Sequence, residues 1–156
     1  MHTANKIDKV IDNLYIGNYD GALDKNIILS HGIKTIVNCT KRKDKINMNV
    51  NYLQIPIDDP PYMNDINYVN KNFVDIVNFI SNARNYGNVL VHCVAGSQRS
   101  ATIVAIFLMV KFKLNYKDAI QFMKSKRPIC FFGNVNYMDS LIHTQNMLDS
   151  YNRYYQ

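Results

Sequence analysis

The stretch from residue 88 to residue 110 constrains the fold more than any other part of the chain. A short β-branched run ends in His92-Cys93, a loop of small residues follows, and an apolar segment suited to a buried helix completes the stretch. This order predicts a strand, a loop and a helix. In such a unit the loop N–H groups point inward and the helix N-terminus adds partial positive charge, so the loop is suited to bind an anion.

Cys93 and Arg99 give this loop its expected chemistry. A helix N-terminus and a neighbouring cation favour the thiolate form of a cysteine, so Cys93 is expected to be a nucleophile. The planar guanidinium of Arg99 can hold two phosphate oxygens at once, which a lysine cannot do. Phosphate is therefore the anion that we expect the loop to bind.

The neighbours of these two residues have expected supporting roles. His92 is placed to orient the loop and to support the thiolate, and Ser100 can donate a hydrogen bond to the sulfur when it leaves. Between them, the loop is expected to bind phosphate through Val94, Ala95, Gly96, Ser97 and Gln98.

The pattern His92-Cys93, five residues, then Arg99-Ser100 resembles the signature of cysteine-dependent protein phosphatases. Ala95-Gly96 and the run from 99 to 102 are similar to the dual-specificity (VH1-like) branch, and the small chain is similar to its atypical and viral members. The resemblance also covers the segments 13–17 and 32–38, and a closing helix marked by Asn134, Tyr137 and Leu141. It extends over about residues 7–150.

Gln98 departs from the resemblance, because most dual-specificity enzymes have a serine there. Its amide can still hydrogen-bond, so the departure bears on rate more than on class. The alternative without function is a structural cysteine at the end of a buried strand with a surface arginine nearby.

Strand and helix patterns alternate along the chain. Strands are expected at residues 7–11, 14–16, 33–39, 50–55 and 88–92, and helices at 24–31, around 66–80, 101–110, 116–126 and 135 to about 151. The last helix is expected to contribute Tyr137, Leu141, Met147 and Leu148 to the core. The alternation predicts one α/β domain, 1–156, with a mostly parallel twisted sheet flanked by helices. The resemblance implies the cysteine-phosphatase fold.

Composition bounds the location and the partners. Three cysteines, an odd number without metal-ligand spacing, favour a reducing compartment over a disulfide framework. The longest apolar run, 101–110, is half the length of a membrane span, and the polar start has no signal core, so a soluble cytoplasmic or nuclear monomer is expected. The net charge of +6 includes basic runs at 41–45 and at Lys124, Lys126 and Arg127, which typically form solvated surface.

A reaction at Cys93 would proceed through a phosphocysteine and would need no metal or other cofactor. The leaving oxygen needs a proton, and by chemistry alone Asp58, Asp59 and Asp65 are candidates for the acid. The segment 55–59 resembles the family segment in which the catalytic aspartate lies three residues after an Ile-Pro pair. That resemblance implies Asp59 as general acid and base, with Asp58 as a neighbour whose charge favours the protonated form of Asp59.

Three functions remain open. The first is a protein phosphatase acting on phosphotyrosine and on phosphoserine or phosphothreonine, with a phosphorylated protein as partner. The second is a phosphatase of a non-protein substrate, either RNA 5′-phosphate or a phosphoinositide, which the basic charge leaves possible. The loop residues Val94, Ala95 and Gln98 stand against it, because enzymes of those kinds usually carry His or Lys in the loop. The third is a non-catalytic phosphate-binding module, against which Cys93 and Arg99 together argue.

Overall fold

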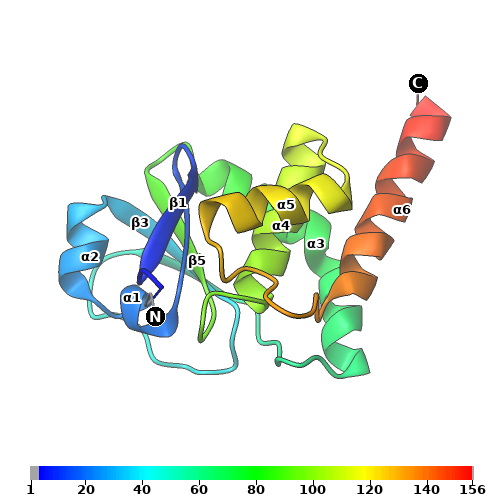
Figure 1. The fold of residues 1–156 in the computed structure, drawn as a ribbon. Coiled ribbons are helices and arrows are strands. Elements are labelled where there is room, and N and C mark those ends of the chain that lie inside the picture. The colour runs from blue at the N-terminus through cyan, green and yellow to red at the C-terminus, as the bar shows by residue number, and fades with distance from the viewer. Residues whose placement is uncertain (1–3, 156) are drawn as a thin grey trace.

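A five-stranded sheet with helices on both faces forms the centre of the molecule (Figure 1). The computed structural model describes residues 4–155. The strands lie in the order β1-β2-β5-β3-β4, and only β1 and β2 pair antiparallel. Their bounds are β1 Ile7–Ile11, β2 Leu14–Gly17, β3 Ile33–Asn38, β4 Asn51–Gln54 and β5 Asn88–His92.

Six helices complete the described part of the chain: α1 Tyr19–Ala22, α2 Lys25–Ser30, α3 Met63–Ala83, α4 Arg99–Phe112, α5 Tyr116–Lys126 and α6 Met138–Tyr155. The short helices α1 and α2 cover one face of the sheet, and α3 to α6 cover the other (Figure 1). The structure confirms the predicted α/β domain with a mostly parallel sheet.

Strand β5 lies in the middle of the sheet and is buried on both faces. Leu90 packs with the cluster under α1 and α2, whereas Val89 and Val91 point to the opposite cluster under α3 to α6. Successive side chains of a strand alternate between faces, so an uninterrupted apolar run is what a central parallel strand requires. The carboxyl end of β5 is thereby fixed between β2 and β3.

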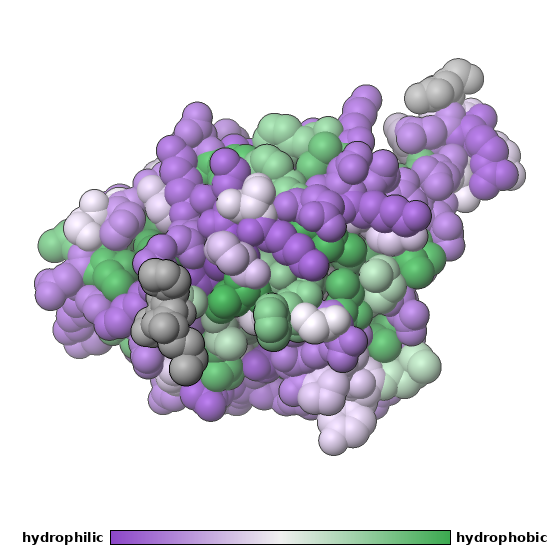
Figure 2. All heavy atoms as spheres, viewed as in Figure 1, coloured by the Kyte–Doolittle hydropathy of each residue, from purple (hydrophilic) through white to green (hydrophobic). Residues whose placement is uncertain are grey.

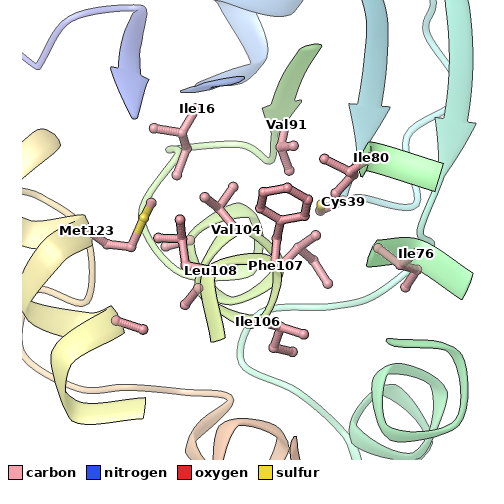
Figure 3. Close-up of a cluster of buried hydrophobic side chains, with 14 of the residues drawn as sticks. Ile16, Cys39, Ile76, Ile80, Val91, Val104, Ile106, Phe107, Leu108 and Met123 are labelled. Atoms are coloured by element: carbon pink, nitrogen blue, oxygen red, sulfur yellow. The ribbon is translucent and has the colours of Figure 1, made fainter. Parts of the chain in front are cut away.

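Helix α4 is buried nearly all round, with every residue from Ser100 to Met109 in the core. Figure 3 shows Val104, Phe107 and Leu108 of this helix among side chains from the sheet, α3 and α5. A helix that is apolar on all sides belongs in the interior. Burial of α4 anchors its first residue, Arg99, at the end of the loop that follows β5.

The five strands, α2 and α5 begin and end within about one residue of the expected bounds, whereas α3 and α4 extend two to three residues further at each end than expected. Three further points differ from the expectation. The short helix α1 was not expected. Helix α6 begins at Met138, not at 135, because Asn136 and Tyr137 are held by hydrogen bonds to other loops. Met147 is 51% exposed, since it lies on the outer face of α6, whereas Tyr137 and Leu141 are buried and Leu148 packs against the core.

The surface in Figure 2 shows hydrophobic residues in small groups among hydrophilic ones, and the far end of α6 is mostly hydrophilic. Within residues 4–155, no helix is both long and apolar enough to cross a membrane.

Candidate active site

The loop of residues 93–98 connects the end of β5 to the start of α4. In an open parallel sheet, ligands bind beyond the carboxyl ends of the strands, and this loop lies beyond the central one. The loop also faces the N-terminus of a 14-residue helix, whose free N–H groups favour an anion. The loop therefore stays a predicted anion site.

Cys93 and Ser100 lie together at the base of this loop. The Cys93 Sγ atom is 3.1 Å from Ser100 Oγ, and both residues are buried. Ser100 is in the first turn of α4, so its hydroxyl is fixed by the helix. The hydroxyl can donate a hydrogen bond to a thiolate, which stabilises the ionised sulfur.

Arg99 has donor capacity that the described residues do not use. Its Nη1 donates to the carbonyl oxygen of Ile57 at 3.2 Å, and its buried Nε atom has no partner among residues 4–155. Buried donors in native proteins nearly always have a partner, so an unpaired donor at the end of such a loop indicates a place for an acceptor. Phosphate oxygens are acceptors of the right kind.

His92 lies behind the loop and not in it. It is buried, and its Nδ1 lies 3.1 Å from the carbonyl oxygen of Cys93. Burial lowers the pKa of His92 to about 4, so the ring is neutral at pH 7 and its Nδ1–H donates to that carbonyl. His92 can thus orient the loop backbone, but it adds no positive charge near Cys93.

Arg127 holds the loop from behind. This side chain is only 1% exposed, and it donates from Nε to the carbonyl oxygen of Gly96 at 2.9 Å and from Nη2 to that of Ala95 at 3.2 Å. The N–H of a trans peptide points away from its C=O, so these bonds turn the N–H groups of Gly96 and Ser97 to the other side of the loop. Arg127 also forms an ion pair with Asp8, with Nη1 2.7 Å from Oδ2.

Gly96 has no substitute in this arrangement. Its φ is +68°, and a Cβ atom there would lie 2.6 Å from the carbonyl oxygen of Gly17 and 2.9 Å from Arg127 Nη2.

Because Arg127 is buried and hydrogen-bonded to the loop, the expectation that it belongs to a solvated basic cluster was wrong. A sequence signal was present, since Arg127 ends α5 just before Pro128, but nothing in the spacing relates it to residues 95 and 96.

Arg127→Met is expected to lower the free energy of unfolding by about 3 to 5 kcal/mol, because removing one partner of a buried ion pair leaves the other charge uncompensated. The same change frees the carbonyls of Ala95 and Gly96, so phosphate binding weakens as well. Urea denaturation and phosphate titration measure the two effects. Lys124→Met, at an exposed position in the last turn of α5, removes the same charge and should change stability by less than about 0.5 kcal/mol. Equal small effects of both variants would contradict the role of Arg127.

The other loop residues are held by the segment 127–137. Ser97 Oγ donates to the carbonyl oxygen of Ile129 at 2.7 Å. The Gln98 side chain, 7% exposed, donates to the carbonyl oxygen of Asn134 at 2.6 Å and accepts from the backbone N–H of Asn136 at 3.0 Å. The Gln98 side chain therefore points to this segment. The residue that stands where most dual-specificity enzymes have a serine is thus used here to hold the segment 134–136.

Two of the candidate acids, Asp58 and Asp59, are in the segment 56–62, which we call the acid loop, and Asp65 follows in the first turn of α3. The acid loop lies beside the loop of residues 93–98, which we call the phosphate loop, and the structure separates the three acids. Asp58 is paired with Lys41, whose Nζ lies 2.7 Å from Oδ2. Asp65 is 5% exposed and accepts from the backbone N–H of Tyr62 at 2.8 Å, so it caps the start of α3. Asp59 is exposed, and its Oδ1 accepts from Asn136 Nδ2 at 2.6 Å.

Cys39 and Cys130 are buried free thiols. Burial raises the pKa of Cys39 well above its usual value and that of Cys130 to about 12, so both stay protonated at pH 7. Among residues 4–155, no group of three or more His, Cys, Asp or Glu side chains is arranged to hold a metal ion.

The sequence and the fold of this chain are similar to those of known proteins. The family model described as "Dual specificity phosphatase, catalytic domain" matches residues 14–147. Dual specificity protein phosphatase 15 of Mus musculus is 33% identical over 127 residues, which are 81% of this chain and 52% of that protein. The chain therefore spans about half the length of that relative.

Two further similarities cover nearly the whole chain. Protein 123R of Invertebrate iridescent virus 6 is 30% identical over 148 residues, 94% of this chain and 97% of that one. The crystal structure of human DUSP28 superimposes with a TM-score of 0.79 at 21% identity, over 94% of this chain and 97% of that chain, which is a likeness of fold. The chain belongs to the family of dual specificity phosphatase catalytic domains.

Proposed function

We propose that the protein is a phosphatase that removes phosphate from phosphotyrosine and from phosphoserine or phosphothreonine in proteins. The observation that carries the proposal is the pairing of Cys93 Sγ with Ser100 Oγ at 3.1 Å, beside an Arg99 whose buried Nε has no partner among residues 4–155. Such a site offers a nucleophile, a stabiliser for it when it leaves, and a ligand for phosphate oxygens. A thiolate nucleophile requires a reducing environment, which supports action in the cytoplasm or the nucleus.

In the proposed first step, the Cys93 sulfur attacks phosphorus in line while the bond from phosphorus to the substrate oxygen breaks. The loop N–H groups and Arg99 bind the equatorial oxygens of the transferring phosphate, and Asp59 gives its proton to the leaving oxygen. The products are the dephosphorylated side chain and a phosphocysteine.

In the second step, water attacks the phosphorus of the phosphocysteine and passes a proton to Asp59. The bond between phosphorus and sulfur breaks, and Ser100 donates a hydrogen bond to the departing thiolate. Inorganic phosphate is released and the starting state of the site is restored. No metal takes part in this scheme.

A substrate panel tests the proposal. We expect phosphotyrosine and phosphothreonine peptides to be hydrolysed with kcat/KM at least tenfold above that for phosphoinositides and for triphosphate-ended RNA. Faster turnover of a lipid or an RNA would replace the protein substrate by that class. Binding of phosphopeptides without any turnover would instead make the protein a phosphate-binding module.

A further inference from the structure

The segment 134–137 is hydrogen-bonded to both loops of the candidate site. On one side the backbone N–H of Asn136 donates to Gln98 Oε1 at 3.0 Å, and Gln98 belongs to the phosphate loop. On the other side Asn136 Nδ2 donates to Asp59 Oδ1 at 2.6 Å, and Asp59 belongs to the acid loop. A single residue thus connects the two loops.

Neighbouring contacts keep this connection in place. Gln98 is nearly buried and also donates to the carbonyl oxygen of Asn134 at 2.6 Å, so the segment is held at two points by one side chain. The buried Tyr137 donates from its hydroxyl to the carbonyl oxygen of Asp58 at 2.5 Å, which fixes the backbone of the acid loop. Asn136 therefore reaches Asp59 from an anchored position.

Asp59 itself has little else to hold its side chain. The residue is exposed, and Asn136 is the single hydrogen-bond partner of its carboxyl group among residues 4–155. An exposed aspartate without a partner would occupy several rotamers, and each would place the carboxyl oxygens differently. The hydrogen bond from Asn136 selects one of these arrangements.

We infer that Asn136 is a positioning residue for Asp59, an inference that rests on the proposed role of Asp59 as general acid. The Asn136 amide nitrogen is only a donor, so the Asp59 oxygen that it contacts must be an acceptor. When Asp59 is protonated, its proton is then on Oδ2, the oxygen that Asn136 leaves free. Asn136 thereby sets both the direction of the carboxyl group and the oxygen that carries the proton.

The consequence is confined to substrates that need the acid. A displacement of about 1 Å of a catalytic group can cost on the order of 10²-fold in rate, and general acid catalysis contributes about 10²- to 10⁴-fold. A leaving group that is stable as an anion departs without a proton and gains little from Asp59. Loss of Asn136 should therefore slow the reaction of alkyl phosphates selectively.

Asn136→Ala is tested on a phosphothreonine peptide, whose alkoxide leaves poorly, and on 4-nitrophenyl phosphate, whose phenolate leaves well. We expect kcat/KM to fall about tenfold on the peptide and by less than about twofold on the aryl phosphate. The loss on the peptide should be in kcat with KM unchanged, because Asn136 does not contact the phosphate loop through its side chain. Asn64→Ala, an exposed asparagine beside the acid loop, is the matched control and should leave both reactions unchanged.

A double-variant comparison separates positioning from general damage. In the Asp59→Asn background, adding Asn136→Ala should change neither reaction, because the group that it positions is gone. Equal losses on both substrates in the single variant, or no loss on the peptide, would overturn the inference. If Asp59→Asn alone gives no loss that depends on the leaving group, Asp59 is not the acid, and the inference fails together with that part of the proposed function.

Discussion

Cys93→Ser is expected to abolish turnover, with a loss in kcat/KM on the order of 10⁴-fold or more, while phosphate binding is retained. The serine hydroxyl is close in size to the thiol but is not ionised at neutral pH, so the nucleophile is lost. The proposed binding groups are the loop backbone, Arg99 and the start of α4, and the substitution removes none of these. Steady-state kinetics on a phosphotyrosine peptide and calorimetric titration of the same peptide measure the two properties.

Cys39→Ala provides the control for this experiment. Cys39 is a fully buried thiol that packs in the core near Phe107 and Ile80 (Figure 3), and its protonated form cannot act as a nucleophile. The control variant should lose about 1 kcal/mol of stability through the small cavity, and its turnover should stay within about twofold of the parent. Substantial activity in the Cys93→Ser protein would show that another group attacks phosphorus.

The second large effect is expected from Asp59→Asn. Comparison with Asp58→Asn shows which of the two neighbouring aspartates is the general acid. An asparagine at 59 cannot give a proton, so kcat/KM on alkyl phosphates should fall by about 10²- to 10⁴-fold, with a much smaller loss on aryl phosphates that carry an acidic phenol. The alkaline limb of the bell-shaped pH profile should also disappear, since that limb reports the essential acid. The acidic limb, which belongs to the nucleophile and the substrate, should remain.

Asp58→Asn should neither lower kcat/KM on alkyl phosphates steeply nor remove the alkaline limb, because the Asp58 carboxylate is paired with Lys41. Asp58→Asn removes one solvent-exposed ion pair, and such pairs contribute little to stability. A large leaving-group-dependent loss in Asp58→Asn and none in Asp59→Asn would mean that the acid is one position earlier than the Ile-Pro pair implies. If neither variant shows a loss that depends on the leaving group, the general acid is a residue other than Asp58 and Asp59.

The strand, loop and helix around Cys93 could be predicted from sequence because each is determined by neighbours in the chain. The β-branched run of β5, the small loop residues and the apolar helix α4 are local patterns, and together they indicate that Cys93, Arg99 and Ser100 lie near one another. The neutral state of His92 was not predicted, because burial of its ring depends on packing from other elements.

The partners of the acid loop could not be predicted, because they come from distant parts of the chain. Asn136 is 77 residues from Asp59, and Lys41 is 17 residues from Asp58. Residue type and spacing gave three candidate acids, and a resemblance of one segment selected among them. The hydrogen bonds that distinguish the candidates depend on how two loops meet in space, which periodicity does not encode.

The contacts of Arg127 set a limit on how short a working fragment of this protein can be. The match to the family model begins at residue 14, after β1 has ended, so a fragment designed on that boundary would omit the antiparallel edge strand. It would also omit Asp8, the counter-ion of Arg127, and the carbonyl oxygen of Asn5, which accepts from Arg127 Nη1 at 2.6 Å. Without those partners the buried guanidinium of Arg127 would no longer be fixed against the carbonyl oxygens of Ala95 and Gly96. A fragment that keeps the loop of residues 93–98 in place should therefore begin before Asn5.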